Sequence, residues 1–115
     1  MKSSELQEYM NYFTGTEHYY RVPWGFVITD GVKGFIEKAE AVWMLNIVGS
    51  VYLYKRENFN DIVTVDLNIK NGKGDIVLKV GKRVFHKQHL AHTDCPDGEW
   101  RFFMIDGVFL WNREY

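Results

Sequence analysis

The sequence predicts an α+β fold, with two or three N-terminal helices packed on one face of a mostly antiparallel sheet of about five strands. Apolar side chains recur at helical spacing up to about residue 54, and they alternate with polar ones after residue 62. Asn71-Gly72 and Asp106-Gly107 lie between the alternating stretches, as hairpin turns do. The 115 residues, 46% of them hydrophobic, suffice for one core, and no repeat or linker divides them. We therefore expect a single domain over residues 1–115.

A short helix is expected over residues 4–13, with Ser3 or Ser4 as its N-cap. One stripe of this helix carries Leu6, Tyr9, Met10 and Phe13. An aromatic connection follows over residues 16–27, and a short extended piece is expected near residues 26–28.

The main helix is expected to begin after Thr29 or Asp30, both of which are good capping residues. Its apolar positions follow helical spacing: Val32, Phe35, Ile36, Ala39, Trp43 and Ile47. From residue 42 to 54 the stretch is apolar nearly all round, which is typical of a helix buried in the middle of a domain. A bend near Glu40 would divide the whole stretch into two helices.

Strands are expected after residue 62, where IVTVDLNIK (62–70) alternates apolar and polar side chains. NGKG (71–74) predicts a hairpin turn, after which DIVLKV (75–80) resumes the alternation. Gly81-Lys82 predicts a second tight turn, and RVFHK (83–87) a third strand.

The last hairpin has the strongest local signal. WRFFMI (100–105) and VFLWN (108–112) are joined by Asp106-Gly107, a pair that tolerates the positive φ values of a type I′ turn. This hairpin brings the sheet to about five strands, and the simplest packing lays the apolar helix across one face.

The charge and the cysteine content indicate which partners and which cellular compartment suit the protein. The net charge is −1 and the isoelectric point about 6.4, so the chain as a whole has no basic footprint for nucleic acid. A single cysteine excludes an intramolecular disulfide and favours a reducing compartment. The start lacks a secretory pattern, and the apolar stretch 42–54 is too short to span a bilayer. We expect a cytoplasmic protein that does not enter a membrane.

Three histidines and the only cysteine recur at every third position: His86, His89, His92 and Cys95. Imidazole and thiolate are good zinc ligands, so a zinc-dependent protein is one alternative. Spacing of three gathers side chains on one face of a helix, however, and this segment is expected to begin as a strand. On a strand His86 and His89 would point to opposite faces. We therefore predict a strand end and a polar loop, with no metal and no cofactor.

The aromatic connection offers a different kind of site. Tyr19, Tyr20, Arg21 and Trp24 surround Pro23, and rings in a loop cannot all face inward. Exposed rings beside an arginine can anchor a protein partner or stack on bases. The alternative is that these rings cover the apolar helix and close the core. We predict partner binding at these four residues.

Four strings carry a resemblance to a known group of proteins. They are FTGTEHYYR (13–21), TDGVKGFIEKAEAVWMLN (29–46), HTDCPDGEW (92–100) and DGVFLWNREY (106–115). In this order they resemble a family of unknown function, made of small proteins from bacterial genomes, prophages and other mobile elements. That family shows Thr-Asp-Phe-Pro where this chain has Cys95, which implies packing at this position and not metal binding. The family's Leu-Leu-Asp and Leu-Pro-Ser-Glu-Tyr strings read MLN and WNREY here.

The resemblance implies no catalytic residues, and the sequence itself contains no catalytic constellation. The favoured function is that of a non-enzymatic accessory protein of a phage or mobile element, which binds a protein partner. The alternative is a single-stranded nucleic-acid-binding protein that uses a local basic edge. Candidate residues for that edge are Lys70, Lys79, Lys82, Arg83 and Lys87. The sequence leaves the partner, the pathway and the oligomeric state open.

Overall fold

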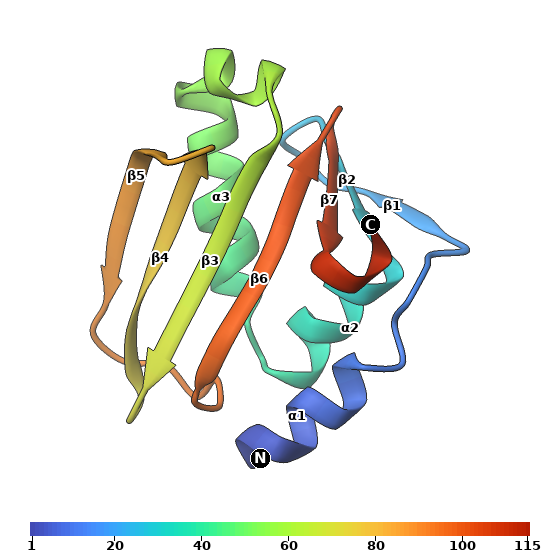
Figure 1. Cartoon of the computed structure of the whole chain (residues 1–115), viewed down its shortest axis with the longest axis vertical. Helices are drawn as coiled ribbons and strands as arrows, with labels where there is room; N and C mark the ends of the chain where they lie inside the picture. The colour runs from blue at the N-terminus through green and yellow to red at the C-terminus, as the bar shows by residue number, and fades with distance from the viewer.

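The computed structural model describes residues 1–115 as one seven-stranded sheet with helices on one face (Figure 1). The helices are α1 (Ser3–Met10), α2 (Asp30–Lys38) and α3 (Val42–Tyr54), with 3-10 turns η1 (Arg56–Asn60) and η2 (Asn112–Glu114). The strands are β1 (Tyr19–Arg21), β2 (Val27–Thr29), β3 (Val63–Lys70), β4 (Lys73–Val80), β5 (Arg83–Leu90), β6 (Gly98–Ile105) and β7 (Val108–Trp111). The α+β prediction is confirmed.

The sheet has the order β1-β2-β7-β6-β3-β4-β5, two strands more than expected. The five strands read from alternation are all present, and β5 continues past residue 87 to Leu90. The extended piece near residues 26–28 is β2, which pairs in parallel with β7. β1 was not anticipated. It has only three residues and pairs with β2 alone, so its sequence carries too short a pattern to be recognised.

The predicted cap of the first helix is wrong. Lys2 occupies the N-cap position of α1, and no side chain caps the helix. The hydroxyl of Ser3 instead donates to the backbone carbonyl of Asp97, which ties the helix to the start of β6. The helix also ends at Met10, three residues earlier than expected, and its buried residues are Leu6 and Met10.

The main helical stretch divides where the sequence predicted. Thr29 caps α2 by accepting from the backbone N–H of Val32, and Glu40 adopts a left-handed backbone with φ of 52°. A left-handed φ is unfavourable for any residue other than glycine and is incompatible with a continuous α-helix. Glu40 therefore interrupts the helical stretch, and α3 begins after it at Val42. α3 is not buried all round, however. Leu53 and Tyr54 are 54% and 85% exposed, because only one sheet layer packs against the helix and nothing covers its outer side.

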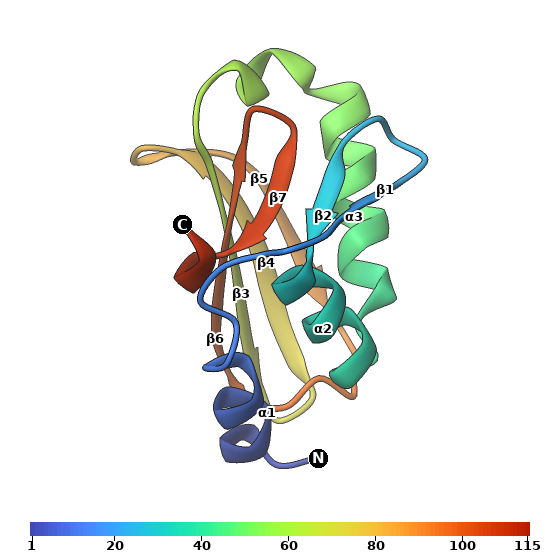
Figure 2. The ribbon, with the colours of Figure 1, turned by 90° about the vertical axis from the view of Figure 1, so that its right-hand side faces the viewer.

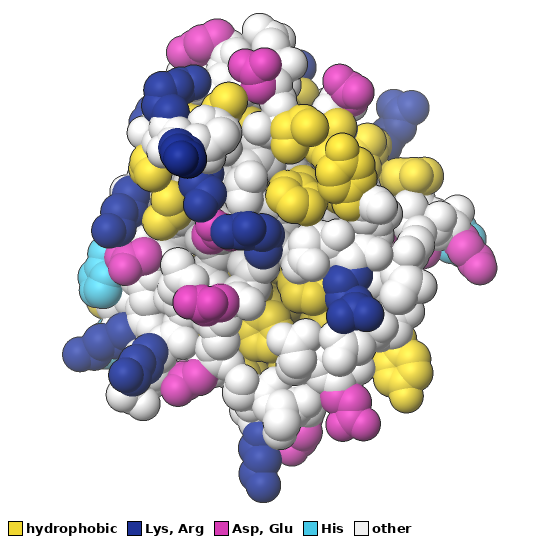
Figure 3. All heavy atoms as spheres, in the orientation of Figure 1, with side chains coloured by type: hydrophobic (Ala, Val, Ile, Leu, Met, Phe, Trp, Pro, Cys, Tyr) yellow, Lys and Arg dark blue, Asp and Glu magenta, His cyan; other side chains and the backbone are white.

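The core lies between the helices and one face of the sheet (Figure 2). Alternate residues of the central strands point into it: Val63, Val65, Leu67 and Ile69 of β3, and Trp100, Phe102 and Met104 of β6. The other face of the sheet is uncovered. Figure 3 shows apolar side chains on its β6–β7 side and Lys and Arg side chains along its β5 side. No helix combines the length and apolar character that a membrane span needs.

Candidate functional site

The four residues of the predicted zinc alternative do not come together. His86 and His89 lie on opposite faces of β5, as expected for a strand, and His89 Nδ1 contacts the Asp75 carboxylate at 3.3 Å. His92 is exposed in the loop after β5. No group of three or more His, Cys, Asp or Glu side chains is placed to hold a metal ion.

Cys95 is a core residue. Its side chain is only 3% exposed, and its Sγ donates to the carbonyl of Pro96 at 3.7 Å. Burial raises the pKa of the thiol to about 12, with a smaller contribution from the charge of Asp97. A thiol that stays protonated at neutral pH is a poor nucleophile and a poor metal ligand.

Of the four residues predicted to bind a partner, two are exposed and two are half-buried. Tyr19 is 59% exposed and Arg21 is exposed on β1, the edge strand opposite β5. Tyr20 is half-buried, and its hydroxyl donates to Asp30 at 2.8 Å. Trp24 is half-buried and packs on Gly49 of α3, where a Cβ would stand 2.2 Å from the indole ring. Partner binding at these residues stays a prediction.

A carboxylate with several hydrogen-bond donors lies at the N-terminus of α2. The Asp30 carboxylate accepts from the backbone N–H groups of Glu17 and His18 and from the hydroxyl of Tyr20. The backbone N–H of Glu17 contributes most to lowering the Asp30 pKa to about 2, and the Tyr20 hydroxyl comes next. Asp30 therefore remains ionised and holds the segment before β1 against α2, which leaves it no proton to give as a general acid.

Glu114 closes the same helix end from the other side. Its carboxylate accepts from the hydroxyl of Thr29 at 2.6 Å and from the backbone N–H groups of Gly31 and Trp111, both at 2.9 Å. Parts of two of the strings that carry the family resemblance, TDGV (29–32) and NREY (112–115), thus meet at one helix terminus. Their residues are used to tie η2 to α2, and their carboxylate suits the positive end of the helix dipole.

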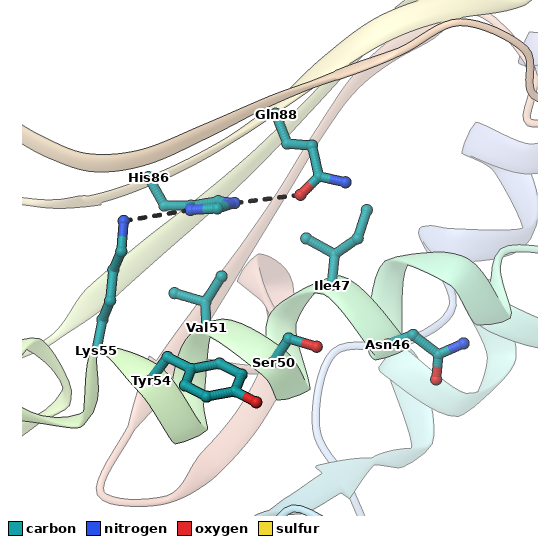
Figure 4. Close-up of a pocket in the computed structure, with 8 residues that line it drawn as sticks. All are labelled: Asn46, Ile47, Ser50, Val51, Tyr54, Lys55, His86 and Gln88. Atoms are coloured by element: carbon teal, nitrogen blue, oxygen red, sulfur yellow. Dashed lines mark hydrogen bonds between the residues drawn. The ribbon is translucent and has the colours of Figure 1, made fainter.

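A groove of about 390 Å³ runs between α3 and the edge strand β5 (Figure 4). Its lining comes from the outer side of α3 and the helix-facing side of β5: Asn46, Ile47, Ser50, Val51, Tyr54, Lys55, His86 and Gln88. Figure 4 shows Ile47 and Val51 pointing from the helix toward the strand, and His86 and Gln88 facing them. The groove thus has an apolar floor between polar rims.

A chain of polar contacts fixes the β5 side of this groove. Lys55 Nζ donates to the carbonyl of Phe85 at 2.8 Å and lies 3.4 Å from His86 Nδ1. His86 Nε2 lies 3.3 Å from Gln88 Oε1. Both ring nitrogens of His86 thus have a neighbour, Lys55 on one side and Gln88 on the other, and neither nitrogen forms a hydrogen bond with Ser50 or Tyr54.

β5 also presents a free backbone edge, because it is the last strand of the sheet. Its pairing with β4 is regular from His86 to Leu90 and shifts register between Leu78 and Lys79, which leaves Phe85 as the extra residue of a bulge. Lys82, Arg83 and Lys87 are exposed along this edge, and no carboxylate forms an ion pair with them. The edge is therefore open to pairing and positively charged.

Sequence reasoning missed the groove, although it noticed the basic residues of β5. The overlooked signal lies in the apolar stretch of α3, which Asn46, Ser50 and Tyr54 interrupt at intervals of four. That interval marks one helix face. Those residues form the outer rim of the groove, which only the position of β5 alongside α3 completes.

Comparison with other proteins gives a family but no characterised relative. No curated protein and no solved structure matches the chain. The profile of one family covers almost the whole chain, from the second residue of α1 to the C-terminus. The chain belongs to the family of unknown function DUF6876, whose profile matches residues 4–115.

Proposed function

We propose that the protein is a non-enzymatic protein-binding module that receives its partner in the groove between α3 and β5. The observation that carries the proposal is that this groove lies next to the edge strand β5. The outer backbone edge of β5 is unpaired, and its basic side chains have no carboxylate partner. Apolar floors with a few fixed polar groups are typical of binding sites, and an open sheet edge adds main-chain hydrogen bonding. The groove brings together no nucleophile and free base, which favours binding over catalysis.

The proposal is tested by placing a photoreactive amino acid at Gln88, on the rim of the groove, in the native host. We expect one stoichiometric adduct after irradiation. A matched variant carries the same group at Arg113, which is exposed on η2 and has no side-chain hydrogen bond or ion pair. Filling the groove by Ser50→Arg should abolish the Gln88 adduct while the circular dichroism spectrum stays unchanged. Equal adducts at both positions, or an adduct that survives Ser50→Arg, would refute the groove as the site.

The basic edge gives a second candidate, binding of single-stranded nucleic acid. Lys82, Arg83 and Lys87 support it, whereas Lys79 is neutralised by Asp66 at 3.1 Å. Such binding would weaken steeply with salt, with a logarithmic slope near −0.7 for each phosphate contacted. Titration of a labelled oligonucleotide at several salt concentrations measures the slope, and a flat response argues against this function.

We further propose that the protein acts in the cytoplasm as an accessory protein of a phage or mobile element. The resemblance of its four strings to proteins of such elements supports this setting, and the reduced, buried thiol of Cys95 suits a reducing compartment. The genes adjacent to this one provide the test. Phage or mobilisation genes as neighbours would support the proposal, and a conserved metabolic operon would contradict it.

A further inference from the structure

We propose that the segment bound in the groove is an extended acidic peptide, which adds to β5 as a further strand of the sheet. The inference rests on the proposed function and deepens it, because it names the chemistry and the backbone geometry of the partner. Three independent features lead to it: the open half of the β5 edge, the different character of its two faces, and its unneutralised charge.

The backbone of β5 is open along its second half. From His86 to Leu90 its pairing with β4 is regular, so the opposite edge presents a regular row of unpaired N–H and C=O groups. The first half is closed to a new strand, because the bulge at Phe85 disrupts the regular spacing and Lys55 occupies the Phe85 carbonyl. An added strand would therefore pair over about five residues, which is an ordinary strand length.

The side chains of an added strand would alternate between two environments. On the helix side they would lie about 4.8 Å from His86 and Gln88, over the apolar floor of Ile47 and Val51. On the open side they would lie beside Lys87 and His89. The ligand that fits is therefore an alternation of apolar residues and acidic residues, without proline.

Charge selects an acidic peptide over a second copy of the chain. Lys82, Arg83 and Lys87 have no carboxylate partner, whereas Arg101 in the middle of the sheet shares Asp66 with Lys79. In antiparallel pairing of two copies over this open half, a register centred on Lys87 would set Lys87 directly opposite its own copy. Like charges directly opposite each other destabilise a strand pair, so self-association at this edge is disfavoured.

A single-stranded nucleic acid is less well matched to the same edge. Such ligands need rings on which bases stack. The open side of β5 carries Lys87 and His89 but no Phe, Tyr or Trp, while Phe85 packs against Phe59 with ring centroids 5.7 Å apart. The positive charge could hold phosphates, but the groove offers a backbone edge and an apolar floor instead.

The test uses two capped peptides of about eight residues, one alternating valine and glutamate and the other alternating valine and lysine. Binding to the full chain is followed by amide chemical shifts. We expect the acidic peptide to bind at least about tenfold more tightly, as several surface charge pairs acting together allow. The shifted amides should include His86–Leu90, and those residues should gain protection from hydrogen exchange.

Two variants separate charge from backbone pairing. Lys87→Glu should invert the preference toward the lysine peptide, whereas the matched reversal Arg113→Glu should leave it unchanged. A central proline in the acidic peptide should abolish binding, because proline cannot donate to the strand ladder. The spectrum of each variant also reports whether it is folded, so loss of structure is recognised directly.

Several outcomes would overturn the inference. They are equal affinity for the two peptides, shifts confined to residues outside β5 and α3, tighter binding of a single-stranded oligothymidylate, and a dimer formed through β5. Failure of the peptides with a persistent photo-adduct at Gln88 would refute the acidic strand and leave the protein-binding function standing. Failure of both would refute both.

Discussion

The carboxylate of Asp30 holds residues 17–20 against the start of α2. The backbone N–H groups of Glu17 and His18 and the hydroxyl of Tyr20 all donate to it. These donors favour the ionised form, so the pKa of Asp30 falls from its ordinary 3.8 to about 2. The folded state therefore takes up this proton less readily than the unfolded state. The stability that results is present above pH 3.8 and is lost as the pH falls toward 2.

Replacing Asp30 by asparagine should remove this acid-dependent part of the stability. We expect Asp30→Asn to unfold at a lower temperature than the wild type above pH 4, with the gap narrowing as the pH approaches 2. Thermal unfolding by circular dichroism at several pH values measures the gap. Asp61→Asn is the control, because Asp61 is exposed and makes no ion pair. A gap that stays constant from pH 5 to 2 would contradict the role of Asp30.

Gly49 is needed for its lack of a side chain. A Cβ at this position of α3 would lie 2.2 Å from the indole ring of Trp24, far inside van der Waals contact. We expect Gly49→Ala to reduce the free energy of unfolding by about 1–3 kcal/mol, measured by urea denaturation, because the indole must leave its place. Gly15→Ala is the matched control. No atom lies within 4 Å of the added Cβ there, so the loss should be close to zero.

Among the long strands, β3 and β5 differ in how many neighbouring strands pair with them. β3 lies between β4 and β6, whereas β5 has one neighbour and an open edge. Hydrogen exchange of the free protein should therefore be slowest in β3 and fastest in the second half of β5 among the four long strands. Exchange followed by NMR tests this expectation. Equal protection of the two strands in a monomer would mean that the β5 edge is already covered.

The strands also show which parts of the fold local sequence patterns can predict. Alternation in IVTVDLNIK (62–70) and DIVLKV (75–80) predicted β3 and β4, and Asp106-Gly107 predicted the β6–β7 turn, where both residues have positive φ values of 49° and 75°. β1 and the parallel pairing of β2 with β7 were missed, because a three-residue strand has no readable period and β7 lies about 80 residues beyond β2. The groove was missed for the same reason, since it joins α3 to a strand 30 residues further on.

At the scale of the whole molecule, one helical layer covers one side of the sheet. The apolar pattern of α3 predicted burial on all sides, because hydropathy alone does not say how many layers a fold has. In the structure its outer residues are exposed, and the helix needs β5 beside it to shelter Ile47 and Val51. A chain of this size has enough apolar residues for one core only. Side chains at the edge of that core therefore remain partly exposed to solvent.

Cys95 reports on the integrity of that core. Because the thiol is buried and its pKa is raised to about 12, it should resist a thiol reagent at pH 8 in the native state. Addition of urea should make labelling fast at the same concentration that unfolds the protein, because exposure restores an ordinary thiol. Colour release from an aromatic disulfide reagent measures the rate. Rapid labelling without denaturant would show that the region around Pro96 opens independently of the core.

The parallel pairing of β2 with β7 has a consequence for the order in which the protein assembles during its synthesis. β3, β4 and β5 follow one another along the chain and can pair as soon as they leave the ribosome. β2 meets the sheet only through β7, and residues 108–111 are translated some 80 positions later. β1 and β2 precede the other strands in the sequence, yet they can join the sheet only after β7 has been translated.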